Sequence, residues 1–388
     1  MFVLFKNGDA VLDSVYYLFS PIKQYSIKVL LKNSGGKMIN SQKKSKWSVY
    51  IADPEKDKEL IFKARKIFFG HPGDEDYIEW LYYKNPAGPL HIAFAMDGDT
   101  IAGQYAVVPV NILLNGKQLK GSIPVDLFVN SRYRYQGIFT ALAEAIHSRL
   151  SDYNVILTLG HTNKNSRHGF LNNLKFKEPY PSYFIVRPLS LIPGVHPVAG
   201  KICAKIPIGF INNTAGRLKA LRFKLTDEPD RDELDTLWDT ISSQINFGLV
   251  KDATWTKWRY KKNPHFSYRF VLAYKNGAPV GYVVWNKDKI MQDKYGYKSI
   301  VLMDIMAADL WIAVSLIQKF LEEIASLVHY VKAATLLWNR EFYSLLMNGF
   351  IPLMPQSLIL KVHDERLYDS ISLQSKKWPH GYYISDSD

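Results

Sequence analysis

The residues from 134 to 140 have the types and the spacing that could bind a diphosphate. They are Arg134, Tyr135, Gln136, Gly137, Ile138, Phe139 and Thr140. If a helix begins within this segment, its first backbone amides have no partner inside the helix, and the positive end of its dipole attracts an anion. Gly137 has no Cβ, so a phosphate group can approach the main chain closely at that residue.

The sequence around this segment predicts a strand, a loop and a helix. Residues 123–129 are apolar and rich in β-forming types, which indicates a buried strand. From Ile138 to Leu150 the apolar residues recur at the spacing of one helical face. A further apolar strand is expected over Val155–Leu159. A strand, a crossover helix and a strand form a βαβ unit, so we expect the two strands to be parallel.

Two motifs resemble those of the GNAT superfamily of acyl-CoA-dependent N-acetyltransferases. The first is Arg134-x-x-Gly137-x-Phe139, which begins eight residues after Asp126 and resembles motif A. The family prefers Gly or Ala where this chain has Phe139. The second motif begins at Gly160 and resembles motif B, a loop rich in Asn and Ser that opens a helix ending in a Gly-Phe pair. Lys175 replaces the Gly of that pair.

This resemblance implies a site for an acyl-CoA, with acetyl-CoA as the expected co-substrate and without a metal. Backbone amides around Leu127, Phe128 and Val129 would polarise the thioester carbonyl, and the segment 134–140 would hold the diphosphate. Asn165 would bind the amides of the pantetheine arm. A second role open to Asn165 is the N-terminal cap of a helix, and the two roles are compatible. The resemblance also implies that two central strands part after a bulge, so that the arm enters between them.

Acyl transfer to an amine also requires a neutral nucleophile and a proton for the departing thiolate. Many members of the family use a Tyr on the motif-B helix as the acid, but this chain has Phe170 near that place. The candidates for acid and base are therefore His161 after the strand 155–159, Tyr180 beyond the motif-B helix, and Asp126. His161 could also be an ordinary hydrogen-bonded loop histidine, and Asp126 could have a structural role.

A second copy of the same pattern lies further along the chain. The segment Trp258–Pro264 repeats Trp80–Pro86 almost letter for letter, and Asp304 follows Asp126 at the same separation. Several landmarks at a constant separation indicate a duplicated domain. In place of the glycine loop the second copy has Asp309, a negative residue where a phosphate would lie, so we expect it to bind no cofactor.

We therefore predict an α/β (α+β) protein of two tandem GNAT-like domains. Each is expected to have a mixed, mostly antiparallel sheet with a parallel βαβ pair and flanking helices. The expected parts are a basic N-terminal extension over 1–47, the acyl-CoA domain over 48–189, a linker over 190–226, the degenerate domain over 227–365 and a tail over 366–388.

The composition narrows the class of protein further. Of the 388 residues, 47% are hydrophobic, which supports sizeable cores. A single cysteine, Cys203, suits a reducing compartment such as the cytoplasm. The formal net charge of +13 comes in large part from lysines between residues 21 and 52. These predict either a solvated extension or an arm for phosphate or lipid head groups. Neither a signal peptide nor a transmembrane segment is expected.

The function that fits these residues best is acetyl transfer from acetyl-CoA to the primary amine of a small molecule such as an amino sugar. Two alternatives stay open. One is an aminoacyl-tRNA-dependent transferase of the tandem-GNAT type, which builds cell-wall peptides. The other is a non-catalytic module that binds CoA or a partner. Nucleic acid is otherwise not expected as a partner, and the sequence does not determine the oligomeric state.

Overall fold

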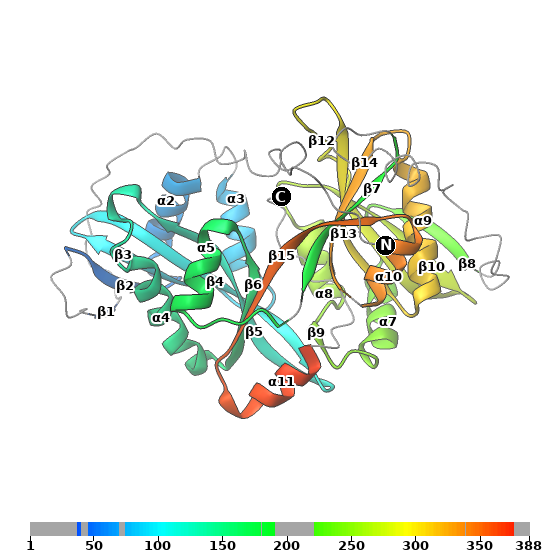
Figure 1. Ribbon diagram of the computed structural model, residues 1–388. Coiled ribbons are helices and arrows are strands. Elements are labelled where there is room, and N and C mark those ends of the chain that lie inside the picture. The colour runs from blue at the N-terminus through cyan, green and yellow to red at the C-terminus, as the bar shows by residue number, and fades with distance from the viewer. Residues whose placement is uncertain are drawn as a thin grey trace. The chain divides into compact units, whose positions relative to one another are not determined.

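The computed structural model describes residues 37–39, 46–69, 74–179, 181–190, 221–337 and 339–375. Most of the predicted N-terminal extension, most of the predicted linker and part of the predicted tail lie outside these residues. The described residues form two compact units (Figure 1). The first unit contains the described residues up to 179 together with 357–375, and the second contains those between 181 and 356.

The first unit is built on a sheet with the strand order β1-β2-β3-β4-β5-β6-β15. Its strands are β1 (Lys37–Ile39), β2 (Ser48–Ala52), β3 (His91–Asp97), β4 (Thr100–Leu114), β5 (Lys117–Val129), β6 (Val155–Thr162) and the last part of β15 (Ile351–Val362). Its helices are α2 (Lys58–Phe69), α3 (Asp74–Ile78), α4 (Ile138–Leu150), α5 (Lys164–His168) and α11 (Tyr368–Ser375), with short turns η1 (Glu79–Tyr83), η2 (Ser131–Tyr133), η3 (Ser151–Tyr153), η4 (Gly169–Asn173) and η7 (Glu365–Leu367). Strands β5 and β6 are parallel, and the other neighbours in this sheet are antiparallel.

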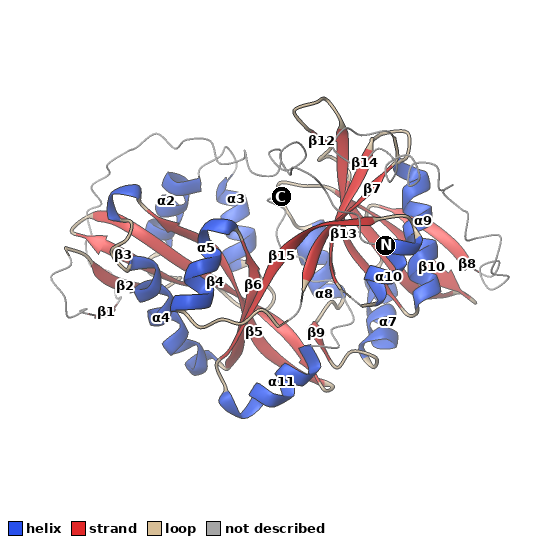
Figure 2. Ribbon diagram, viewed as in Figure 1, coloured by secondary structure: helices blue, strands red, loops and turns tan. Residues whose placement is uncertain are grey.

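The second unit has a sheet with the order β8-β10-β11-β13-β14-β7-β15, to which β12 adds beside β13 (Figure 2). Its strands are β7 (Ser182–Pro188), β8 (Leu221–Thr226), β9 (Phe247–Leu249), β10 (Tyr268–Lys275), β11 (Ala278–Asn286), β12 (Met291–Gln292), β13 (Lys298–Ala307), β14 (Tyr330–Leu336) and the first part of β15. Its helices are α7 (Arg231–Ser242), α8 (Ala253–Thr256), α9 (Leu310–Ile324) and α10 (Arg340–Met347), with the π-helical turn η6 (Lys257–Lys261). Strands β13 and β14 are its parallel pair.

The observed architecture is mixed α/β, with parallel and antiparallel strands and helices packed on the sheets, which confirms the predicted fold class. The parallel pair predicted over 123–129 and 155–159 is also confirmed, as β5 and β6. The two units show the same order of elements. In each, helices and a π-helical turn precede an antiparallel hairpin, and a third strand leads through a long helix to its parallel partner. Trp80 and Trp258 take the same place in the π-helical turns η1 and η6, directly after the first residue.

The strand that completes each sheet is not the next one along the chain. In the first unit, β6 is followed in the sheet by Ser357–Val362 of β15, which pairs with Leu157–Thr162. In the second unit, β14 is followed by β7, which the sequence analysis had assigned to the first domain. Strand β8 falls at the end of the predicted linker and α11 falls in the predicted tail. Backbone pairing between distant segments therefore decides which residues each unit contains.

Each unit has its own apolar core beside its parallel pair. In the first, Leu142 and Ile146 of α4 pack with Phe170 and Phe176 under the sheet. In the second, the apolar face of α9 is fully covered and packs against β11 and β13. Both long helices are amphipathic, and burial of their apolar faces provides most of the stabilisation that a helix gains in a protein. Because α4 follows β5 and α9 follows β13, the packing of each helix also holds the end of the strand before it.

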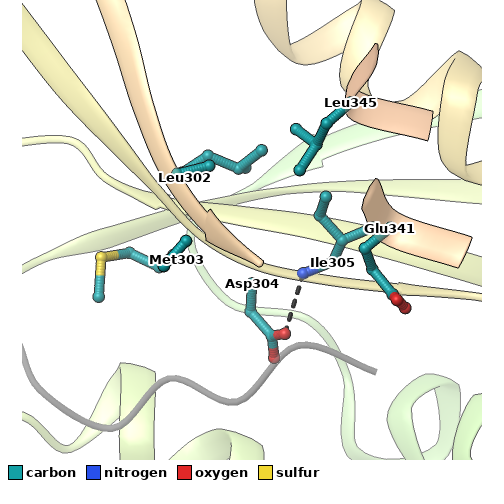
Figure 3. Close-up of a pocket in the computed structure, with 8 residues that line it drawn as sticks. Leu302, Met303, Asp304, Ile305, Glu341 and Leu345 are labelled. Carbon is teal, nitrogen blue, oxygen red and sulfur yellow. Dashed lines mark hydrogen bonds between the residues drawn. The ribbon is translucent and has the colours of Figure 1, made fainter. Parts of the chain in front are cut away.

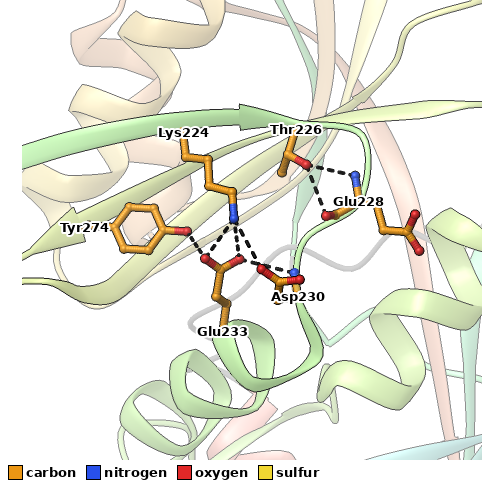
Figure 4. Close-up of polar contacts among 6 residues, drawn as sticks. All are labelled: Lys224, Thr226, Glu228, Asp230, Glu233 and Tyr274. Atoms are coloured by element: carbon orange, nitrogen blue, oxygen red, sulfur yellow. Dashed lines mark hydrogen bonds and ion pairs between the residues drawn. The ribbon is translucent and has the colours of Figure 1, made fainter.

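Helix α7 begins at a capping box that explains why β8 ends where it does. Asp230 is the N-cap, and its side chain and that of Glu233 bond each other's backbone amides. Lys224 of β8 donates to Glu233 (2.9 Å), and the Tyr274 hydroxyl donates to the same carboxylate (2.5 Å), as Figure 4 shows. The capping box satisfies amides that the first turn of a helix leaves unpaired, and the bonds from Lys224 and Tyr274 hold the Glu233 carboxylate in place. No helix in the described part of the chain is long and apolar enough to cross a membrane.

Candidate functional site

The N-terminus of α4 is open toward solvent. Gly137 precedes its first residue with φ 80° and ψ 3°, and no side chain caps the helix. Tyr135 also has a positive φ of 64°, and its side chain is fully exposed. A Cβ built on Gly137 would have no atom within 4 Å. The segment 134–140 therefore presents uncapped backbone amides and the positive end of a helix dipole at one point, which suits a diphosphate.

The corresponding helix of the second unit is closed by its own side chain. Asp309 is the N-cap of α9, and its carboxylate accepts a hydrogen bond from the backbone amide of Ile312 (2.9 Å). A carboxylate at this place satisfies one of the unpaired amides and repels a further anion. The N-terminus of α4 is therefore uncapped and that of α9 is capped by a side chain, as the residue types Gly137 and Asp309 predict.

Strands β5 and β6 part shortly after they begin to pair. Their registered pairs end at Ser122 and Thr158. The next residues are Ile123 and then Pro124, which has no amide hydrogen and cannot donate to a neighbouring strand. A Cβ on Gly160 of β6 would lie 3.0 Å from Pro124 Cδ, so the proline ring abuts β6 at the base of the gap. We call this gap the first fork, with Pro124 and Gly160 at its base.

Beyond its base the first fork is partly exposed, whereas the equivalent gap between β13 and β14, which we call the second fork, is buried. From Pro124 to Val129 every residue of β5 is half-buried, although β4 pairs along its other side. From Leu302 to Ala307 every residue of β13 is buried. In the second unit a pocket of about 20 Å³ is lined by Leu302, Met303, Asp304, Ile305, Ala333, Ala334, Glu341 and Leu345 (Figure 3). That volume fits about one water molecule and no pantetheine arm.

The direction of the amides on β5 follows from one hydrogen bond at its end. The amide of Asn130 donates to the carbonyl of Ala102, on the side of β4 (2.9 Å). Successive amides along a strand point to opposite sides, so those of Val129 and Leu127 face the first fork and that of Phe128 faces β4. The Phe128 side chain stacks on Phe68, with ring centroids 3.9 Å apart.

Asp126 lies at a bulge in β5 and is held by three side chains. Its φ is 49°, a conformation that costs free energy for any residue with a Cβ. Its carboxylate is paired with Arg65 of α2 and accepts a hydrogen bond from the Tyr82 hydroxyl. Gln104 donates to its backbone carbonyl (2.9 Å). These bonds stabilise the bulge and fix the direction of the residues that follow it.

Burial and charge shift the pKa values of the groups around Asp126. Burial raises the pKa of Tyr82 well above its ordinary value, and the Asp126 carboxylate raises it further. Burial would lower the pKa of Arg65, but the neighbouring carboxylate outweighs it and the pKa is raised. Arg65 is therefore a permanent cation and Tyr82 a neutral donor. Asp126 is engaged by both, and its geometry is that of a positioning group at the bulge.

Asp304, the counterpart of Asp126, has a different set of partners. Lys251 donates to one oxygen (2.6 Å) and Tyr282 to the other (3.0 Å). The first oxygen also accepts from the backbone amide of Ile305 (2.9 Å). Burial, and then the charge of Asp304, raise the pKa of Tyr282 well above its ordinary value. Asp304 therefore forms a closed structural cluster.

The predicted motif-B residues follow β6. Asn163 is the N-cap of α5 and accepts from the amides of Asn165 and Ser166 (both 3.0 Å). The alternative that Asn165 caps this helix is therefore wrong, because the loop ends two residues earlier. Asn165 is exposed and its side chain is available for another role. His161 is exposed at the end of β6, opposite Leu358 of β15. Tyr180 lies outside the described residues.

Phe170 is a core residue, and the half-buried Phe139 packs against the same core. Phe139 is packed against Gly169, where a Cβ would collide with its ring. Its ring also meets that of Phe170, which is buried, with centroids 5.2 Å apart. The bulky residue in motif A is thus matched by a glycine on the facing helix. Sequence reasoning missed Gly169 and Arg65, since neither stands in a motif that singles it out.

The described residues contain no group of His, Cys, Asp or Glu side chains that could hold a metal ion. The groups that residues 124–140 provide are backbone amides and a helix N-terminus. An uncovered strand edge, fork-facing amides and an uncapped glycine turn follow one another along residues 124–140. They suit a long ligand that has amide groups and ends in a diphosphate.

Comparison with known proteins bears on the same residues. The sequence over 54–163 matches the family model of an acetyltransferase (GNAT) domain. No curated protein matches the chain in sequence. Among solved structures, the chain is similar in fold to a GCN5-related N-acetyltransferase from Anabaena variabilis ATCC 29413. Their sequences are 12% identical, the TM-score is 0.57, and the match covers 82% of this chain and 73% of that one.

Two other solved structures are similar to the chain. One is a conserved protein of unknown function from Enterococcus faecalis V583, described as a probable N-acyltransferase, with 11% identity, a TM-score of 0.57 and coverage of 81% and 72%. The other is the Saccharomyces cerevisiae N-myristoyltransferase with bound myristoyl-CoA, with 12% identity, a TM-score of 0.53 and coverage of 88% and 84%. At these identities the likeness concerns the fold, and the family follows from the sequence match. The family match thus places a GNAT-type acetyltransferase domain at residues 54–163, which include β5, the glycine turn and α4.

Proposed function

We propose that the chain is an acyl-CoA-dependent N-acyltransferase whose first unit binds the acyl-CoA in the first fork. The observation that supports this most directly is the difference between the two forks. Residues from Pro124 to Val129 are half-buried along one uncovered edge, whereas their counterparts from Leu302 to Ala307 are all buried. Since a pantetheine arm needs an unpaired strand edge, the first unit is the better host.

In this proposal the backbone of the first unit provides most of the binding. The amides of residues 134–140 hold the diphosphate, and the uncovered edge of β5 pairs with the pantetheine arm. Asn165, exposed beside the fork, is available to bond an amide of the arm. The amides of Leu127 and Val129 face the fork and are suited to polarise the thioester carbonyl.

The proposed reaction is direct transfer. The neutral amine of the acceptor attacks the thioester carbon, the C–N bond forms as the C–S bond breaks, and the CoA thiolate takes up a proton. His161 at the end of β6 is our candidate for proton transfer, directly or through a water, with Asp126 and Tyr180 as the other candidates. Asp126 is the weaker of these because Arg65 and Tyr82 already engage its two oxygens.

We further propose that the second unit is a degenerate copy of the first. The shared order of elements supports a duplication, as does the equal separation of Trp80 from Trp258 and of Asp126 from Asp304. Asp309 and Asp304 would then fill, from within the protein, the two places that a cofactor uses in the first unit. The proposed acceptor is a small primary amine, with acetyl-CoA as the donor.

A matched pair of glycine substitutions tests the binding site. Gly137 and Gly277 have nearly the same φ, 80° and 83°, and a Cβ on either would have no atom within 4 Å. Gly277 lies in the β10–β11 hairpin of the second unit. Gly137→Val and Gly277→Val therefore introduce similar backbone strain. Titration calorimetry with acetyl-CoA should show binding to the wild-type protein and to Gly277→Val, and loss of at least tenfold in affinity for Gly137→Val.

Equal affinities of the two variants would contradict the site, and absence of binding to the wild-type protein would contradict the function. Transfer itself is tested by release of free CoA thiol across a panel of primary amines. In that assay His161→Ala should lower the rate constant without changing the affinity for acetyl-CoA. An unchanged rate would remove His161 from the mechanism.

A further inference from the structure

The aspartates at the two forks pair with cations from different elements, although each also accepts from the tyrosine of its π-helical turn, Tyr82 or Tyr260. In the second unit Asp304 accepts from Lys251 and also from the amide of the next residue, Ile305 (2.9 Å). In the first unit the two oxygens of Asp126 are taken by Arg65 and by Tyr82. Lys251 reaches Asp304 from the segment just before α8, whereas Arg65 reaches Asp126 from α2. The cation thus approaches each aspartate from a different element of its unit.

The backbone amide of the residue after the aspartate is the group that could bind the thioester oxygen. Leu127 corresponds to Ile305, since each directly follows the aspartate of its unit, and the Leu127 amide faces the first fork. Asp304, which pairs in register with Val284 where Asp126 lies in a bulge, shows that an aspartate carboxylate in this strand can accept from the amide of the next residue. A hydrogen bond from an amide to a carboxylate is charge-assisted and strong. A carboxylate on the Leu127 amide would therefore exclude a thioester oxygen from it.

We propose that Arg65 is a positioning residue that holds the Asp126 carboxylate away from the Leu127 amide and so keeps this amide available for the thioester oxygen. The inference rests on the proposed function of the first fork. The two side chains are 11% and 15% exposed, so their attraction is weakly screened and the pair is well defined. Tyr82 holds the second oxygen, so the ion pair with Arg65 decides where the first oxygen lies.

Loss of Arg65 should therefore release the first oxygen of Asp126 to accept from the Leu127 amide, as the first oxygen of Asp304 accepts from the Ile305 amide. In Arg65→Met the stem remains but the cation is gone, and the Leu127 amide becomes the nearest strong donor for the carboxylate. In Arg65→Met/Asp126→Ala the carboxylate is also gone, so the amide is available again. A purely structural role of Arg65 predicts no such recovery, because the second substitution removes still more contacts.

Infrared difference spectroscopy of the full chain with acetyl-CoA, labelled with ¹³C at the thioester carbonyl, tests this directly. We expect the carbonyl band to move to lower frequency on binding to the wild-type protein, to stay near its position in water in Arg65→Met, and to move again in the double variant. Calorimetry should give acetyl-CoA affinities within about threefold for all three. With an amine that the wild-type protein accepts, kcat should fall about 100-fold in Arg65→Met, as on loss of one oxyanion donor; recovery in the double variant is judged on the carbonyl band alone.

The proposal is overturned if Arg65→Met shows the carbonyl band position or the kcat of the wild-type protein. It is also overturned if the carbonyl band of the double variant stays where it is in Arg65→Met. If Arg65→Met alone does not fold, Asp126→Ala and the double variant, which both lack the carboxylate, should show the moved band, and its absence in either overturns the proposal. Absence of acetyl-CoA binding to the wild-type protein overturns the proposed function together with this inference. Binding with an unmoved band in the wild-type protein overturns this inference alone.

Discussion

Two histidines of the first unit, the buried His147 and the half-buried His363, should make its stability depend on pH between 5 and 6.5. His147 of α4 shares a hydrogen bond with the Tyr105 hydroxyl (3.0 Å), and His363 shares one with the Thr158 hydroxyl (2.7 Å). Their rings lie 5.2 Å apart. Burial, then the charges of His363 and Lys361, lower the pKa of His147 to about 2. Burial and Lys361 lower the pKa of His363 to about 4.

The sign and the size of the effect follow from these pKa values. Both histidines are neutral in the folded protein at pH 5, whereas in the unfolded chain each takes up a proton near its ordinary pKa of 6.5. Because the unfolded state binds more protons, the stabilisation is complete above pH 6.5 and is lost as the pH falls. At about 1.4 kcal/mol per pH unit, each histidine costs about 2 kcal/mol at pH 5. This loss depends on the unfolded pKa alone, since both folded values lie below 5.

Chemical denaturation of the wild-type protein and of His363→Gln at pH 7.5 and pH 5 measures the effect. Glutamine can still hydrogen-bond to Thr158, but it does not titrate. The loss of unfolding free energy between the two pH values should be about 2 kcal/mol smaller in the variant, and about 4 kcal/mol smaller when His147→Gln is added. His91, whose pKa burial and Lys120 lower to about 4, contributes equally to all three proteins. The same pH dependence in the wild-type protein and both variants would refute the reasoning.

Three further predictions concern single positions. Lys175 has φ 60° where the second unit has Gly349 at 77°, so Lys175→Gly should stabilise the protein by about 1 kcal/mol in thermal denaturation, and an equal gain in Lys175→Ala would contradict this reason. Phe139→Ala should destabilise by about 3 kcal/mol or more. Gly169→Ala should lower the free energy of unfolding of the wild-type protein, because its Cβ would collide with the Phe139 ring, but should change it little in a protein that already carries Phe139→Ala. If the two losses of unfolding free energy simply add in chemical denaturation, the two side chains do not compete for the same volume. Asp309→Ala should cost about 1 kcal/mol through the lost cap of α9. Its acetyl-CoA affinity, measured by calorimetry, should be unchanged, and a changed affinity would assign the second unit a part in binding.

The elements around the candidate site could be predicted from local sequence, because the signals involve neighbours within a few residues. The apolar spacing from Ile138 to Leu150 predicts α4, and the strands on either side predict a parallel pair, as observed. The uncapped turn at Gly137 and the capped one at Asp309 also follow from residue type, since a glycine cannot cap with a side chain and an aspartate can.

Other features have no local signal. Which strand completes the first sheet depends on backbone pairing between β6 and residues 357–362, which lie far along the chain in another part of the sequence. The direction of Phe139 depends on space left by Gly169 on another helix. Neither relation is visible in a window of sequence, because both arise when distant segments pack together.

The sequence by itself predicted the strand before residue 130, the glycine turn, helix α4 and the parallel strand that follows it. Only the tertiary structure decided that Arg65 of α2 engages Asp126 while Lys251 engages its counterpart Asp304. The physical reason is the range of the forces involved. Backbone preferences and caps act within one turn or one strand, whereas a buried charge is paired by whichever opposite charge the completed fold brings within reach.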